Sequence, residues 1–235
     1  MSDRFRSEIA SIRDEVVHMG WFAHGMLGDA VSAMIHQDKN LAQVVRGHKR
    51  ELAQFHDHLE DRIFSTIALY QPVASDMRML VCSLTVVTSS ERIGRYGKDI
   101  ANIVISGNSR NTVLGNTANI FSIPPMTENV LSMIGDALTA YETGDITLIK
   151  DLSRRDDLVD AQRHSIFRES ITYMMEDPRN IGLCTHLLFG AKNIERIGDH
   201  TTNIAENIYY LVHGRALADD RPKGDDTSST LIRSQ

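Results

Sequence analysis

The stretch from Lys192 to Val212, KNIERIGDHTTNIAENIYYLV, decides the fold, because much of it occurs a second time earlier in the chain. The earlier copy runs from Glu91 to Val104, ERIGRYGKDIANIV, and shares the ERIG tetrapeptide and an isoleucine at the next core position. A helix that recurs after about a hundred residues predicts two related modules. In the later copy, one stripe of residues spaced by three and four predicts a single buried helix face, formed by Ile194, Ile197, Thr201, Ile204, Ile208 and Leu211.

The repeat extends beyond this helix. MLGDA at 26–30 matches MIGDA at 133–137, and the acidic turn around Asp38 matches Gly144-Asp145. Each module is therefore predicted to contain three helices in the same order. The fold class predicted is all-α, with two pseudo-symmetric three-helix bundles joined end to end or side by side. A single six-helix globule is the alternative.

Proline and glycine set the expected boundaries. The first repeat covers residues 1–106, with helices near Arg4–His36, Lys39–Tyr70 and Ser75–Ser106 and a break at Gln71-Pro72. Residues 107–125, rich in Gly, Asn, Ser and Thr, are predicted to be a linker. The second repeat covers 126–214, with helices near Met126–Thr143, Asp145–Met175 and Pro178–His213 and a break at Asp177-Pro178. Gly214 is the expected C-cap, and 215–235 is predicted to be a disordered polar tail.

Composition limits the class of protein. The 235 residues are 42% hydrophobic and 24% charged, with 5 prolines and 6% aromatics, which is typical of a soluble helical protein. A formal net charge of −6 disfavours nucleic acid as a partner. No apolar run is long enough to insert into a membrane, and the first residues lack the apolar core of a signal peptide. We therefore expect a cytoplasmic protein, with Cys82 and Cys184 in the core rather than in a redox site.

Acidic side chains form a second pattern, on a different face of the last helix. Glu195, Asp199, Thr202 and Glu206 fall at steps of three and four residues. The preceding helix carries a matching pair, Asp156 and Asp160, with His164 one turn further on. Converging oxygens of this kind suit Mg²⁺ or Mn²⁺, and iron if His164 or His200 adds a nitrogen. The alternative is a solvated face on which the acids pair with nearby arginines, namely Arg154, Arg155, Arg163 and Arg196.

The first repeat lacks this acidic pattern. Its corresponding column reads Glu91, Arg95, Lys98 and Asn102, and its second helix has Lys49 and Ala53 where the acid pair would lie. We expect an ion pair between Glu91 and Arg95. The alternative is that Arg95 and Lys98 attract an anion or an acidic partner.

Catalytic motifs are missing from the sequence. It has no nucleophilic triad, no glycine-rich phosphate loop and no zinc-type spacing of Cys and His. Glu15 and His18 have the spacing of a di-iron ligand pair, but a di-iron site needs two such pairs. The chain is therefore predicted not to be an enzyme, and a hydrolase that uses the second-repeat acids is the weakest hypothesis.

Three segments together resemble the PhoU family: ERIGDHTTNIAENI, DDLVD at 156–160, and EDRIFSTIALYQPVASDMR at 60–78. The resemblance extends from about Arg4 to His213. It implies two three-helix bundles that often assemble into dimers. It also implies an adaptor between the ATPase subunit of a phosphate ABC transporter and a phosphate sensor histidine kinase. Such an adaptor negatively regulates phosphate uptake and phosphate-starvation signalling.

The resemblance also implies metal sites, because some members bind iron, zinc, manganese or magnesium on acid-x-x-x-acid motifs in each repeat. Transferred to this sequence, the second-repeat ligands are Asp156, Asp160, Glu195 and Asp199, with His164, His200 and Glu206 as additional candidates. The first-repeat site is degenerate, because Glu91 is the acid that remains and Arg95 stands where the family pattern has another acid. We therefore predict that this site is lost. A helical store or sensor of iron or manganese is therefore the alternative function.

Overall fold

The computed structural model describes residues 3–107 and 122–215, and these residues are almost entirely helical, with no strand among them. The first repeat contains α1 (Asp3–His36), α2 (Lys39–Gly47), α3 (Lys49–Tyr70) and α4 (Ser75–Ser106). The second contains α6 (Ile123–Thr143), the 3₁₀ turn η1 (Ile146–Ile149), α7 (Leu152–Glu176), the 3₁₀ turn η2 (Pro178–Asn180) and α8 (Ile181–His213). The all-α prediction is confirmed. Most of the predicted linker and tail lies outside the described residues.

The predicted middle helix of each repeat is wrong in one respect, because a separate short element precedes the long helix. In the first repeat α2 ends at Gly47 and α3 begins at Lys49, and in the second repeat η1 stands in the place of α2. Asp38 and Asp145 are the N-caps of these elements: the Asp38 carboxylate accepts hydrogen bonds from the backbone N–H groups of Asn40 and Leu41, and that of Asp145 accepts one from Thr147.

The start of α6 also differs from the prediction. The helix begins at Ile123, so the last residues of the predicted linker are helical. Pro124 and Pro125 lie in its first turn, where proline costs no hydrogen bond and its fixed φ suits the helix. Proline therefore marks the start of this helix, where we expected the end of a linker.

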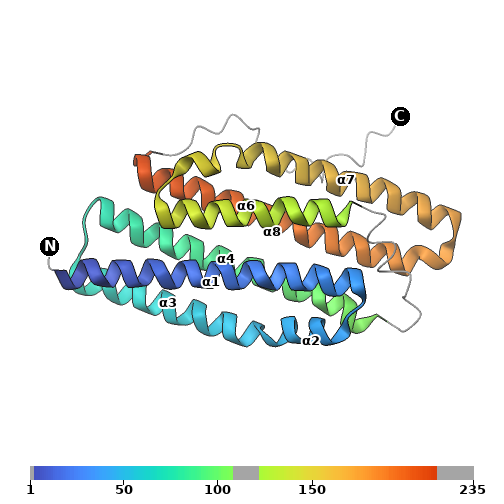
Figure 1. The fold of residues 1–235 in the computed structure, drawn as a ribbon, viewed down its shortest axis with the longest axis horizontal. Coiled ribbons are helices and arrows are strands. Elements are labelled where there is room, and N and C mark those ends of the chain that lie inside the picture. Colours follow the sequence, from blue (N-terminus) through green and yellow to red (C-terminus); the bar gives the residue numbers. More distant parts are fainter. Residues whose placement is uncertain (1–2, 108–121, 216–235) are drawn as a thin grey trace, which may run out of the picture.

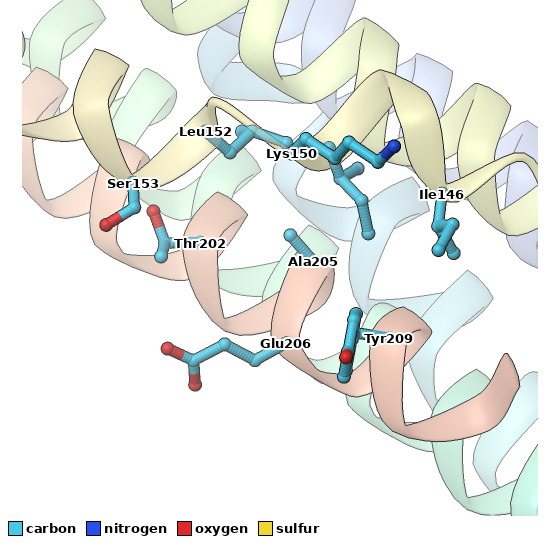
Figure 2. Close-up of a pocket in the computed structure, with 9 residues that line it drawn as sticks. Ile146, Lys150, Leu152, Ser153, Thr202, Ala205, Glu206 and Tyr209 are labelled. Atoms are coloured by element: carbon cyan, nitrogen blue, oxygen red, sulfur yellow. The ribbon is translucent and has the colours of Figure 1, made fainter. Parts of the chain in front are cut away.

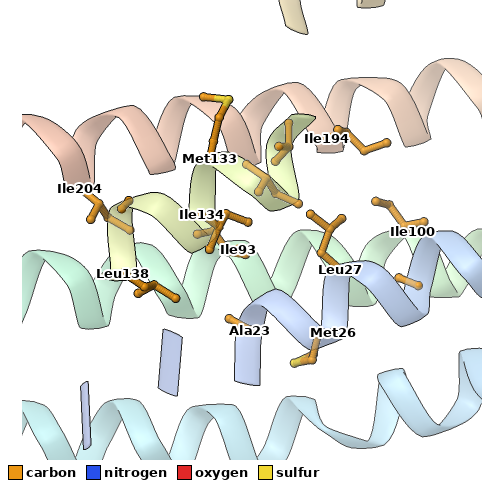
Figure 3. Packing of buried hydrophobic residues seen from close by; sticks show 14 of the residues in the cluster. Ala23, Met26, Leu27, Ile93, Ile100, Met133, Ile134, Leu138, Ile194 and Ile204 are labelled. Carbon is orange, nitrogen blue, oxygen red and sulfur yellow. The ribbon is translucent and has the colours of Figure 1, made fainter. Parts of the chain in front are cut away.

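The two repeats lie side by side and share one core. α4 packs extensively against both α1 of its own repeat and α8 of the other repeat, while α6 packs on α8 and on α1 (Figure 1). Figure 3 shows side chains from these four helices meeting in one layer, among them Leu27 of α1, Ile93 of α4, Ile134 of α6 and Ile194 of α8. Separating the two repeats would expose the apolar side chains that each contributes to this shared core. The repeats are therefore expected to fold as one unit.

Several sequence predictions about the core are confirmed. The predicted stripe on α8 is buried from Ile194 to Ile208, and Leu211 is partly buried. Cys82 and Cys184 are both buried free thiols, and burial raises the pKa of the Cys82 thiol to about 12. A thiol with so high a pKa carries almost no reactive thiolate at neutral pH. No helix in the described ranges combines the length and hydropathy needed to cross a membrane.

The first helices of the two repeats differ in length, which makes the repeats unequal. α1 has 34 residues, whereas α6 has 21. The additional part of α1 covers the far end of the α3–α4 hairpin, where the Phe5 and Tyr70 ring centroids lie 4.9 Å apart and Arg62 Nε lies 2.7 Å from Glu8 Oε1. In the second repeat the α7–α8 hairpin projects beyond α6, as Figure 1 shows at the right.

Candidate functional site

The predicted acids of the second repeat lie where α7 packs against α8. Asp156 is buried, and it is directed at the backbone of α8 beside Gly198. A Cβ at residue 198 would stand 2.9 Å from Asp156 Oδ1. Glycine at this position therefore lets the carboxylate lie directly against α8.

Glu195 is the most enclosed of the candidate ligands in α8, with 7% of its surface exposed. Two cations approach its Oε2 atom: Lys192 Nζ at 2.8 Å and Arg163 Nε at 3.1 Å. The Arg163 Nε and Glu195 Oε2 atoms form no hydrogen bond with good geometry, so the contact between them is an ion pair only. The charge of Glu195 is thus balanced by the chain itself.

Asp160 lies at the rim of the same cluster. Burial of its carboxyl raises its pKa, and the negative charges of Glu195 and Asp199 raise it further, while Arg163 and His164 act in the opposite direction. Asp160 is therefore close enough to Glu195 and to Asp199 to be repelled by both. A bound cation would relieve this repulsion.

The acids do not fit a metal ion in the arrangement described. Within residues 3–107 and 122–215, no three Asp, Glu, His or Cys side chains come together in a group that could hold one. Glu195, which would be central to such a group, already contacts Lys192 and Arg163. The ligand set Asp156, Asp160, Glu195 and Asp199 therefore stays a prediction, and it requires both cationic side chains to move.

The two candidate histidines make other contacts. His164 Nδ1 lies 2.8 Å from the backbone oxygen of Asp160, and its Nε2 lies 3.0 Å from Arg163 Nη2. His200 faces the first repeat, where its ring lies 5.8 Å from that of Tyr96. Burial lowers the pKa of His200, and the positive charge of Arg92 lowers it further, so His200 is expected to be neutral at pH 7.

Glu206 lines a small pocket between η1, the start of α7 and the end of α8, and none of the other candidate acids is part of the lining (Figure 2). The pocket has a volume of about 140 Å³ and is lined by Ile146, Ile149, Lys150, Leu152, Ser153, Thr202, Ala205, Glu206 and Tyr209. In Figure 2 the Glu206 carboxylate is directed away from the Lys150 amine. The predicted polar column of α8 is thus divided between different surroundings.

In the first repeat, the expected ion pair between Glu91 and Arg95 is confirmed, with Arg95 Nη1 lying 3.3 Å from Glu91 Oε1. Lys49 and Ala53, which stand where the second repeat has its acid pair, line a recess at the junction of α2 and α3. The cation that faces Glu91 comes from one turn further along its own helix. The loss of a metal site in this repeat stays a prediction.

Sequence reasoning included Arg163 among the arginines near the acids but missed Lys192. The spacing of three residues between Lys192 and Glu195 on one helix was a visible indication of this ion pair. The other three arginines proposed as partners make different contacts: Arg155 binds Asp136, Arg154 lies near Asp151, and Arg196 lies over the Tyr96 ring.

No catalytic constellation stands out among the described residues. The Ser32 hydroxyl lies 3.4 Å from the His36 ring on the exposed face of α1. The His36 ring nitrogen in this contact also lies 2.9 Å from the Ser32 backbone oxygen. This pair has none of the geometry of an activated nucleophile.

Comparison with known proteins agrees with the repeat. A family model described as the PhoU domain matches residues 16–104 and 123–208, one match in each repeat. A phosphate-specific transport system accessory protein PhoU homolog from Rhizobium meliloti is 40% identical over 231 residues, covering 97% of this chain and 94% of its own. The homolog of the same name from Caulobacter vibrioides is 39% identical over 221 residues, covering 94% and 95%.

Two solved structures share the fold. The crystal structure of PhoU from Pseudomonas aeruginosa has a TM-score of 0.81 and 31% identity, covering 90% of this chain and 100% of that one. The phosphate transport system regulatory protein PhoU from Streptococcus pneumoniae also has a TM-score of 0.81, with 22% identity and coverage of 91% and 99%. The doubled domain match and the relatives that span nearly the whole chain lead to one conclusion: the chain belongs to the PhoU family.

Proposed function

We propose that this protein is a cytoplasmic adaptor that restrains phosphate uptake and phosphate-starvation signalling. It would do so by binding the ATPase subunit of a phosphate ABC transporter and a phosphate sensor histidine kinase, as a homodimer. Relatives that match nearly all of the chain are named accessory proteins of the phosphate-specific transport system, which supports the association with a transporter. An adaptor needs docking surfaces rather than a catalytic site.

The observation that carries the proposal is the uncovered α7–α8 hairpin. Large apolar side chains are exposed along it, namely Phe167, Ile171, Met175, Ile181 and Phe189. A recess of about 320 Å³ lies among them, lined by Arg163, Phe167, Thr185, Leu188, Phe189 and Lys192. A cluster of exposed aromatic and aliphatic side chains around a recess, bordered by cations, is typical of a protein-binding site.

The rim of this recess is shared with the acid cluster. Arg163 and Lys192 line the recess and also contact Glu195. Any cation that binds at the acids and displaces them from Glu195 would free their charges toward the docking surface. Partner binding and cation binding would then be coupled through the same two side chains.

The experiment that tests the proposal measures capture of the ATPase subunit of a phosphate transporter on immobilised protein. The test variant is Phe167→Glu with Phe189→Glu, whose side chains are 46% and 61% exposed. The matched control is Leu69→Glu with Val73→Glu, at the first-repeat hairpin, whose side chains are 77% and 67% exposed. Both variants add equal charge to exposed apolar positions, so folding is expected to be preserved in both.

We expect the Phe167/Phe189 variant to lose capture and the Leu69/Val73 variant to keep it. Equal capture by both variants and by the unaltered protein would show that the α7–α8 hairpin is not the docking surface. If the unaltered protein fails to capture the subunit, the adaptor proposal itself fails. Sedimentation velocity on the same samples tests the dimer separately.

A further inference from the structure

The first repeat has a basic recess where the second repeat has its acids. Arg46, Lys49 and Arg50 surround it, and Gly47 and Ala53 complete the lining. The recess has a volume of about 610 Å³. Since Gly47 and Ala53 have no long side chain, the three cationic side chains frame an open depression instead of covering it.

The chain break between α2 and α3 brings these cations together. Arg46 is in the last turn of α2, and Lys49 and Arg50 begin α3, with His48 between the two helices. The macrodipole of α3 disfavours cations in its first turn, where carboxylates would be stabilising. Helix stability therefore gives no reason for Lys49 and Arg50 to stand at these positions.

The acid in the first turn of α3 is Glu51, which directly follows Arg50. In the parts that the structure describes, Arg46, Lys49 and Arg50 are exposed and make no ion pair, whereas Arg62 and Arg155 each contact carboxylates closely. The protein as a whole has a formal net charge of −6. A concentration of unbalanced positive charge on an acidic protein is a local feature that composition does not explain.

We propose that this recess docks an acidic segment of a partner protein, with Asp or Glu side chains contacting Arg46, Lys49 and Arg50. The proposal rests on the adaptor function, since a docking recess presupposes a partner. Nucleic acid binding draws most of its affinity from many phosphate contacts, and three cations on an acidic protein supply few of them. A membrane-binding surface would combine the cations with large apolar side chains, and none of these lines the recess.

The test is titration of a fluorescent oligoglutamate peptide into the full-length protein, followed by fluorescence anisotropy. The recess variant is the triple charge reversal Arg46→Glu, Lys49→Glu and Arg50→Glu. The control reverses three exposed cations at the other end of the molecule, Arg4→Glu, Arg6→Glu and Arg215→Glu (Figure 1). Both variants change the net charge equally, so any difference between them reports position. Circular dichroism confirms that both remain helical.

We expect the recess variant to weaken peptide binding by about tenfold or more, and the control to stay within about twofold of the unaltered protein. Equal weakening in both variants would reduce the effect to overall charge and overturn the proposal. The proposal would also be overturned if the unaltered protein bound single-stranded DNA or phosphatidylserine vesicles more tightly than the peptide, and only the recess variant lost that binding. The ligand of the recess would then not be an acidic peptide. Peptide binding that persists in the Phe167/Phe189 variant separates this recess from the surface tested by ATPase capture.

Discussion

Gly97 and Gly25 offer a matched pair of Gly→Ala substitutions that tests how α1 and α4 approach each other. Both residues lie inside long helices, where alanine in place of glycine is worth about 0.5–1 kcal/mol of stability. At Gly25 no heavy atom lies within 4 Å of the position that a Cβ would take. At Gly97 the Cβ would stand 3.2 Å from the backbone oxygen of Met26 and 3.3 Å from the backbone nitrogen of Leu27.

The difference between the two variants follows from what each Cβ meets. Backbone atoms of α1 cannot rotate away, so Gly97→Ala forces the helices apart, and overpacking of this kind costs about 1–3 kcal/mol. The gain in helix propensity is common to both variants and cancels. Gly97→Ala should therefore be about 1–3 kcal/mol less stable than Gly25→Ala. For a chain of this length, that difference lowers Tm by about 2–12 °C.

Thermal unfolding followed by far-ultraviolet circular dichroism measures this difference directly. Gly25→Ala is expected to melt slightly above the unaltered protein and Gly97→Ala below Gly25→Ala. Urea unfolding checks the order, because the midpoints should shift without a change in slope. Coincident midpoints for the two variants would refute the argument, since they would mean that α1 and α4 can separate at no cost.

Three further predictions concern polar contacts. Tyr141→Phe removes the buried 2.6 Å hydrogen bond to Ser83 that joins the two repeats. Urea unfolding should show a loss of only about 1 kcal/mol, because the Ser83 hydroxyl keeps its hydrogen bond to a backbone oxygen. Arg62→Met should lower Tm at neutral pH. Arg62 holds the pKa of Glu8 below its usual 4.5, so the stability from this pair is present above that pH and is lost as pH falls through the lowered pKa, and melts in acid should converge. Asp160→Asn should raise Tm at neutral pH, because burial and neighbouring carboxylates raise the pKa of Asp160. The gain should vanish below the usual value of 3.8, and an equal gain at all pH values would contradict it.

The repeat and its long helices could be predicted because they depend on local pattern. The ERIG segments and the spacing of isoleucines in α8 identify one face of a helix without knowledge of its neighbours. The side-by-side arrangement was left open, because it depends on which buried face meets which. Gly20 of α1 bears on that arrangement, since a Cβ there would collide with Leu138 of α6 in the other repeat, but a glycine in a sequence does not identify the residue that packs against it.

The surroundings of the acids were less accessible to sequence analysis. The spacing correctly placed Asp156, Asp160, Glu195 and Asp199 on one helix pair, where the charges of Glu195 and Asp199 help burial to raise the pKa of Asp160. Spacing did not show that two cations would contact Glu195. Arg163 comes from a different helix, α7. Which of several nearby carboxylates it contacts depends on side-chain geometry that cannot be read from the sequence.

The exposed apolar surface of the second repeat and the basic recess of the first follow from differences in length and charge between the two repeats. Because α6 is shorter than α1, the α7–α8 hairpin has apolar side chains that no helix of its own repeat covers. Because Lys49 stands where the other repeat has Asp156, the same structural position is basic in one repeat and acidic in the other.

In each repeat, the shared glutamate, Glu91 or Glu195, has its charge balanced by cations of the chain. Binding of a metal ion in the second repeat would therefore be a competition with Lys192 and Arg163 for Glu195. Those two side chains also border the apolar recess. A metal ion that displaced them from Glu195 would therefore also change the charge along the border of that recess.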